Sequence, residues 1–156
     1  MGTPGGRGPA AILDRLIPGP GSVVEPLAQW IQRTLGRVQG TGAGRAVVTT
    51  LRGNDWFGHP LHPIAVTVPI GAWVTTAFFD LRSLSGGRPG DEHAADTALR
   101  LGVLTAVPAA VTGWAQFLDT SGGARRQTLI HAALNGAGVA LNIWSLAVRT
   151  SGHRRA

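Results

Sequence analysis

Cysteine is absent from this 156-residue chain. Its absence excludes disulfide bonds, thiolate metal sites and any iron–sulfur cluster held by the chain's own cysteines. Lysine is absent as well, so fourteen arginines supply the basic side chains and a formal net charge of +6. No nucleic-acid recognition motif or interleaving of aromatic residues accompanies these arginines. They flank apolar segments instead, which is typical of membrane interfaces and argues against a nucleic-acid partner.

Charged residues are missing from three long stretches, 64–79, 101–118 and 127–148. Each is much longer than a strand of about 5–6 residues, and none shows the charged face of a soluble amphipathic helix. Counted from Trp56, the first stretch also reaches the roughly 20 residues that a bilayer requires. We therefore predict an all-α integral membrane helical bundle with three transmembrane helices, over 64–79, 101–118 and 129–148, in a multi-pass protein of the cell membrane.

Small residues recur at four-residue steps in two of these stretches, which favours close helix packing in lipid. The two series are Gly102, Ala106, Ala110 and Ala132, Gly136, Ala140.

The region before these stretches divides into two predicted parts. Residues 1–21 are rich in glycine and proline, lack a signal peptide and are expected to be disordered. Ser22 and Glu25 have the spacing of a capping box, and the apolar periodicity predicts an amphipathic helix over about 23–38, ended by Gly40. This helix either packs on a protein core or lies in the membrane interface. Residues 39–57 are expected to be a linker, so the predicted units are 1–21, 22–57, 58–149 and a basic tail, 150–156.

Two histidines stand at the entry to the first span, within Gly-His-Pro-Leu-His-Pro at residues 58–63. A residue that precedes proline is disfavoured in the α region, whereas proline suits the first helical position. We therefore expect His59 and His62 in a stiff, extended lead-in, with a helix that begins near Pro63.

Three spans place the start of the first, the end of the second and the start of the third on one side. Topology thus gathers His59, His62, Asp119 and His131 on that side, together with Arg125 and Arg126. The other side collects Asp80 and Arg149. We expect these two to form an ion pair worth about 1 kcal/mol or less, because it is partly exposed.

The polar residues within the spans allow three interpretations. His131 and Asn135 could hold helices together by hydrogen bonds. His62 and His131 could supply two axial ligands to haem b. His59, His62, Asp119 and His131 could bind a divalent metal such as zinc or iron. Asp119 could also fix the tautomer of a neighbouring imidazole.

Several separated motifs resemble, in the same order, the bacterial membrane-protein family called domain of unknown function 2231. They are residues 58–63, residues 68–73 followed by Asp80, residues 108–113 followed by Asp119, and then Arg125, Arg126, His131, Ala132, Asn135, Ser145 and Arg149. The resemblance covers roughly residues 54–149.

The resemblance implies an uncharacterised membrane protein, because the family has no established activity. Some members carry a Rieske-type domain, which suggests electron transfer with a Rieske-type or other redox partner. We therefore expect a non-enzymatic membrane subunit, with no catalytic residue assigned; a metal-binding protein and a structural scaffold are the alternatives. Members usually continue into a fourth span, which we do not expect in this protein. We expect any cofactor pocket either to be formed without a fourth span or to be completed in a homo-oligomer.

Overall fold

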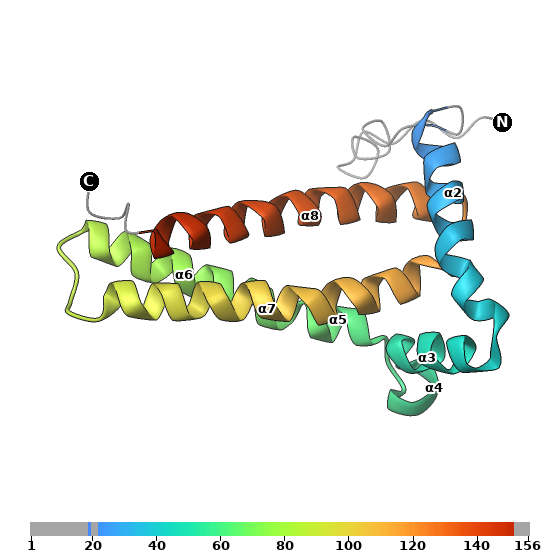
Figure 1. The fold of residues 1–156 in the computed structure, drawn as a ribbon, viewed down its shortest axis with the longest axis horizontal. Helices are drawn as coiled ribbons and strands as arrows, with labels where there is room; N and C mark the ends of the chain where they lie inside the picture. The colour runs from blue at the N-terminus through green and yellow to red at the C-terminus, as the bar shows by residue number, and fades with distance from the viewer. Residues whose placement is uncertain (1–18, 20–21, 152–156) are drawn as a thin grey trace, which may run out of the picture.

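The computed structural model describes Gly19 and residues 22–151, and three long helices dominate it (Figure 1). They are α6 (Thr67–Leu84), which follows the short α5 (Leu61–Ala65), α7 (Asp91–Phe117) and α8 (Gly122–Thr150). Within the described residues there is no strand, so the predicted all-α class is confirmed. The predicted disordered segment 1–21, apart from Gly19, and residues 152–156 of the predicted tail lie outside the described residues.

Three helical stretches are long and apolar enough to cross a membrane: Leu61–Leu84, Asp91–Phe117 and Gly122–Thr150. This confirms the three predicted spans, although each helix is longer than its uncharged stretch. The second begins at Asp91, ten residues before the predicted start at 101. A charge marks where the apolar part of a helix ends, whereas the backbone hydrogen bonds continue into the polar region.

The helices α6 and α7 form the packed core of the bundle. Gly102 and Ala106 on α7 are buried, and the indole of Trp73 on α6 lies directly over Gly102. By contrast, none of the residues of α8 is buried, and a Cβ added at Gly136 would meet no atom within 4 Å. The predicted close packing of small residues therefore occurs at Gly102 and Ala106 but is wrong for α8 in this chain.

The segment expected to be a linker is largely helical. It contains η1 (Arg37–Gly40), α3 (Gly42–Arg52) and α4 (Asn54–Phe57). The Thr41 hydroxyl accepts a hydrogen bond from the Gly44 amide at 3.0 Å and so caps α3. Gly53, at φ 81°, ends the helix in the left-handed conformation that glycine adopts without steric cost. The linker prediction was wrong because this helix is short and its exposed positions are mostly small residues.

The predicted capping box is also wrong. The amphipathic helix α2 (Val24–Gly36) starts without a side-chain cap, and the Ser22 hydroxyl has no hydrogen-bond partner. Glu25 turns away from Ser22 and pairs with Arg125 and Arg126 at the start of α8. Two charged partners bind this carboxylate more strongly than one backbone amide.

Helix α2 packs across the end of the bundle where α7 ends and α8 begins (Figure 1). Ala28 is fully buried there. The Gln32 amide donates to the carbonyl oxygens of Phe117, Leu118 and Thr120 at 3.0, 3.2 and 2.8 Å. Phe117 is the last residue of α7, and Leu118 and Thr120 follow it, so Gln32 binds carbonyls at and just beyond the helix end, where the regular helical partners are missing. The inner face of α2 thus packs on protein, whereas an outer apolar face remains exposed at Val23, Leu27 and Trp30.

The contact between Glu25 and α8 should depend on pH. Hydrogen bonds from Gln29, Arg125 and Arg126, in decreasing order of effect, lower the pKa of Glu25 from 4.5 to about 2. A carboxyl whose pKa is lower in the docked state stabilises docking fully above pH 4.5 and loses this contribution as the pH falls toward 2.

This predicts that α2 loosens at acid pH. Because the chain has no cysteine, a Thr34→Cys variant can carry a single spin label on α2. We expect label mobility to rise between pH 4.5 and pH 2. Glu25→Gln should make α2 mobile at every pH, whereas Asp55→Asn, an exposed carboxylate at the same end, should not. Equal pH profiles for Glu25→Gln and the parent would contradict the assignment.

Candidate functional site

His62 belongs to a helix rather than to an extended lead-in, which corrects the prediction. Helix α5 begins at Leu61, and Pro60 precedes it at φ −57° and ψ 131°. Pro63 therefore lies in the first turn, where the missing N–H would have had no helical partner. The extended region ends at Pro60, so His59 lies outside the helix and His62 inside it.

The ring of His62 lies against α7. Its Nδ1 is 2.9 Å from the carbonyl oxygen of Ala109. Because a carbonyl only accepts hydrogen bonds, Nδ1 carries the proton, so in the neutral ring Nε2 is the nitrogen with the free lone pair. A Cβ on Gly113 would stand 2.8 Å from Cε1 of this ring. Only glycine at position 113 leaves room for the imidazole, so α7 both orients and accommodates His62.

His131 is the neighbour of His62 on α8. The two ring centroids are 6.3 Å apart, and the rings are nearly perpendicular, at 88°. The Asn135 amide nitrogen is 2.8 Å from the His131 carbonyl oxygen and 3.2–3.3 Å from its two ring nitrogens. The structure therefore brings together His62 and His131, with Asn135 one turn further along α8.

The other two residues of the expected metal set lie elsewhere. Asp119 forms an ion pair with Arg52 of α3 at 2.7 Å, and His59 is exposed. Among the described residues, no group of three His, Cys, Asp or Glu side chains could hold a metal ion. The structure thus departs from the four-ligand expectation, because Arg52, in a segment expected to be a linker, takes the carboxylate of Asp119.

The side of α8 near His131 is open. All five residues from 133 to 137 are exposed, and His131 itself is exposed. Figure 1 shows α8 approaching α6 and α7 at its C-terminal end and standing apart from them along its middle. Of the two imidazoles, that of His131 is therefore exposed, whereas His62 is half-buried.

An ion cluster joins the spans at the opposite end. Arg149 binds both carboxylate oxygens of Asp80, at 3.0 and 2.5 Å, and also binds Asp96 at 3.1 Å. Its Nε donates to the Ser145 hydroxyl at 3.1 Å. The predicted approach of Asp80 and Arg149 is confirmed. Asp96 was not predicted, because it lies before the uncharged stretch that was taken as the second span.

Three residues of the histidine site were likewise missed. Arg52 and Ala109 gave no signal, since one was assigned to a linker and the other acts through its backbone. Gly113 did give one, because a glycine closes the Pro-Ala-Ala-Val-Thr-Gly motif at 108–113. A glycine on a buried helix face often marks close approach of another group.

Comparison with known proteins gives a family but no characterised relative. No curated protein and no solved structure matches the chain. A family model described as "Predicted membrane protein (DUF2231)" matches residues 58–156, which include all three spans, the histidine pair and the ion cluster. The chain therefore belongs to the DUF2231 family of membrane proteins.

Proposed function

We propose that this protein is a non-enzymatic subunit of the cell membrane that holds haem b between His62 and His131 and takes part in electron transfer. One observation carries the proposal: two imidazoles from different helices lie next to each other at the entry to the spans, 6.3 Å apart between centroids. Bound haem would supply one-electron transfer.

The donor set fits this group. Two imidazoles that share one metal ion through bonds of about 2.0–2.1 Å have ring centroids roughly 6 Å apart. The hydrogen bond from Nδ1 of His62 to Ala109 selects the neutral tautomer in which Nε2 can act as a ligand. The exposed residues 133–137 leave the pair open at its side.

The family resemblance supports the redox assignment, since some members carry a Rieske-type domain. On this proposal the electron partner is a Rieske-type or other redox protein of the same membrane. A second copy of the chain is the other partner that we propose, because α8 has no buried residue.

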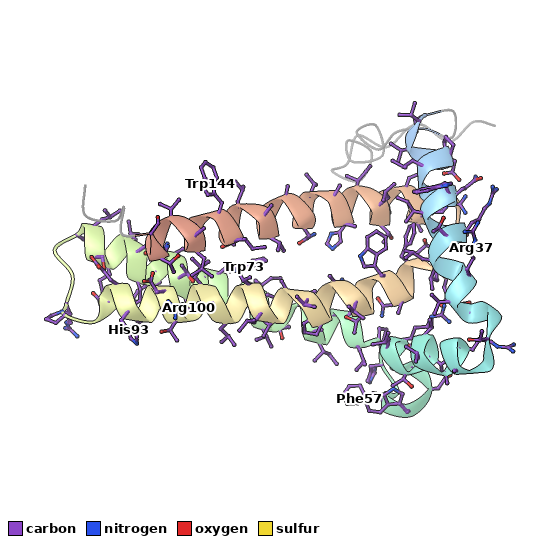
Figure 2. The ribbon with its side chains drawn as sticks, viewed as in Figure 1. Arg37, Phe57, Trp73, His93, Arg100 and Trp144 are labelled. Carbon is purple, nitrogen blue, oxygen red and sulfur yellow. The ribbon has the colours of Figure 1, made fainter. Side chains whose placement is uncertain are left out.

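An absorption spectrum of the purified protein, before and after hemin titration, tests the proposal. We expect a Soret band, and we expect His62→Ala and His131→Ala each to abolish it while the helical circular dichroism stays unchanged. His93→Ala is the matched control, because this exposed histidine lies near the far end of α7 (Figure 2). No Soret band after hemin titration, or equal bands in all variants, would refute haem ligation.

A structural role for His62 is the second candidate, and the hydrogen bond to Ala109 favours it. In that case His62→Ala removes one hydrogen bond, which lowers the free energy of unfolding by about 1 kcal/mol and with it the melting temperature. His131→Ala then has a smaller effect, and neither metal nor haem is found. A third possibility is a divalent metal held by the same pair of histidines. Metal analysis of the purified protein distinguishes this from haem binding and from a purely structural role.

A further inference from the structure

The short helices α2, η1, α3 and α4 form a collar, residues 24–57, at one end of the bundle. Figure 1 shows that this collar is wider than the three spans: α2 extends past α8 on one side, and α4 lies beyond α5 and α7 on the other. The collar contacts Arg125 and Arg126, which directly precede the uncharged stretch of α8. It therefore lies at headgroup level, and its overhanging parts lie over lipid.

Exposed aromatic side chains support this placement. Trp30, Trp56 and Phe57 are 64%, 61% and 48% exposed. The rings of Trp56 and Phe57 lie 5.6 Å apart, and Figure 2 shows Phe57 beside α4, outside the three spans. Tryptophan is enriched at the headgroup level of membranes, where its ring is amphipathic. The collar thus has the side chains of an interfacial element.

Three collar arginines have no acidic partner within the described part of the chain. Arg33, Arg37 and Arg45 are exposed, and the one hydrogen bond given by their guanidinium groups is from Arg33 to the Gln29 side chain at 3.2 Å. Trp30, Arg33 and Arg37 follow steps of three and four residues, so they share one face. Guanidinium groups bind phosphate oxygens in a bidentate manner.

The two ends of the described structure differ in charge. The collar end has six arginines and three carboxylates, namely Arg33, Arg37, Arg45, Arg52, Arg125 and Arg126 against Glu25, Asp55 and Asp119. The other end has four of each, namely Arg82, Arg88, Arg100 and Arg149 against Asp80, Asp91, Glu92 and Asp96. Among the described residues, the collar end therefore carries the excess of positive charge.

We propose that the collar binds anionic phospholipid headgroups through Arg33, Arg37 and Arg45, with Trp30 and Trp56 anchored beside them. Charge complementarity selects an anionic lipid over a zwitterionic one, and the contact of α2 with Arg125 and Arg126 places the collar arginines at headgroup level. This inference is independent of the proposed haem, because none of these residues contacts the histidine pair.

Tryptophan quenching by brominated lipids tests the proposal. The full-length protein is placed in phosphatidylcholine nanodiscs that contain the same small fraction of either brominated phosphatidylglycerol or brominated phosphatidylcholine. We expect more quenching by the anionic lipid, since an arginine near an anionic surface strengthens the association by up to about fivefold. The excess should fall as salt rises.

Arginine variants test which residues cause the excess quenching by the anionic lipid. Arg33→Gln, Arg37→Gln and Arg45→Gln combined should remove the excess, and these exposed substitutions should leave circular dichroism unchanged. Arg88→Gln with Arg100→Gln, at the other end, should retain it. Equal quenching by both lipids in the parent, an excess that survives the triple variant, or an equal loss in the control would each overturn the proposal.

Discussion

Replacing Arg149 with alanine should lower the free energy of unfolding by about 2–3 kcal/mol. The substitution leaves Asp80 and Asp96 next to each other without their shared cation, and removal of one partner from a buried ion pair costs roughly 3–5 kcal/mol. We expect a smaller loss because the two carboxylates are 29% and 27% exposed, whereas Arg149 is 13% exposed. The earlier expectation of about 1 kcal/mol or less assumed a single surface pair.

Two further variants separate charge from packing at this cluster. Asp96→Asn should cost about 1 kcal/mol or less, since the bidentate contact between Arg149 and Asp80 remains. Arg149→Leu combined with Asp80→Asn and Asp96→Asn should recover much of the loss, because it removes both carboxylates together with the cation. Unfolding in mixed detergent micelles, followed by circular dichroism, measures all of these. A triple variant less stable than Arg149→Ala would show that the cluster stabilises chiefly by packing.

Replacing Gly102 with leucine should be about as damaging, with a loss of about 2–3 kcal/mol. A Cβ at this position would overlap the indole of Trp73, well inside van der Waals contact, at the centre of the α6–α7 interface. Overfilling a packed interior typically costs about 1–3 kcal/mol, because side chains leave their preferred rotamers and the backbones move apart.

Gly136→Leu on α8 is the matched control, since the same change there meets open space. It should leave the unfolding free energy unchanged or raise it slightly, because leucine has a higher helix propensity than glycine. Gly102→Leu combined with Trp73→Ala should regain part of the loss by removing the obstructing ring. Equal effects at positions 102 and 136 would mean that helix propensity, rather than helix contact, determines the cost.

The three-helix bundle was predictable because the uncharged stretches that indicate its spans are long. Uncharged stretches of sixteen residues or more leave few alternatives to spans, and the order of span ends is enough to bring Asp80 to Arg149. The collar was not predictable from the same signals. Its helix α3 has eleven residues and few large apolar ones, and its position depends on contacts such as Arg52 with Asp119 that are distant in sequence.

The histidine site was likewise predictable in part. Depth within the membrane follows from span order, and this was enough to pair His62 with His131. Which neighbours each ring touches depends on helix rotation and on backbone atoms, which carry no signal in the side-chain sequence. The Ala109 carbonyl belongs to that class, whereas the glycine that closes the motif at 108–113 did indicate the space at Gly113.

The uneven packing of the three spans has a consequence for biogenesis. Helices α6 and α7 bury their shared face against each other, so this hairpin has its main contacts once its second helix has been synthesised. Helix α8 has no buried residue and is attached by Arg149 at one end and by Arg125 and Arg126 at the other. These attachments lie near opposite surfaces of the bilayer. We therefore expect α8 to join last, in a step that completes only when both of its ends have reached the correct sides.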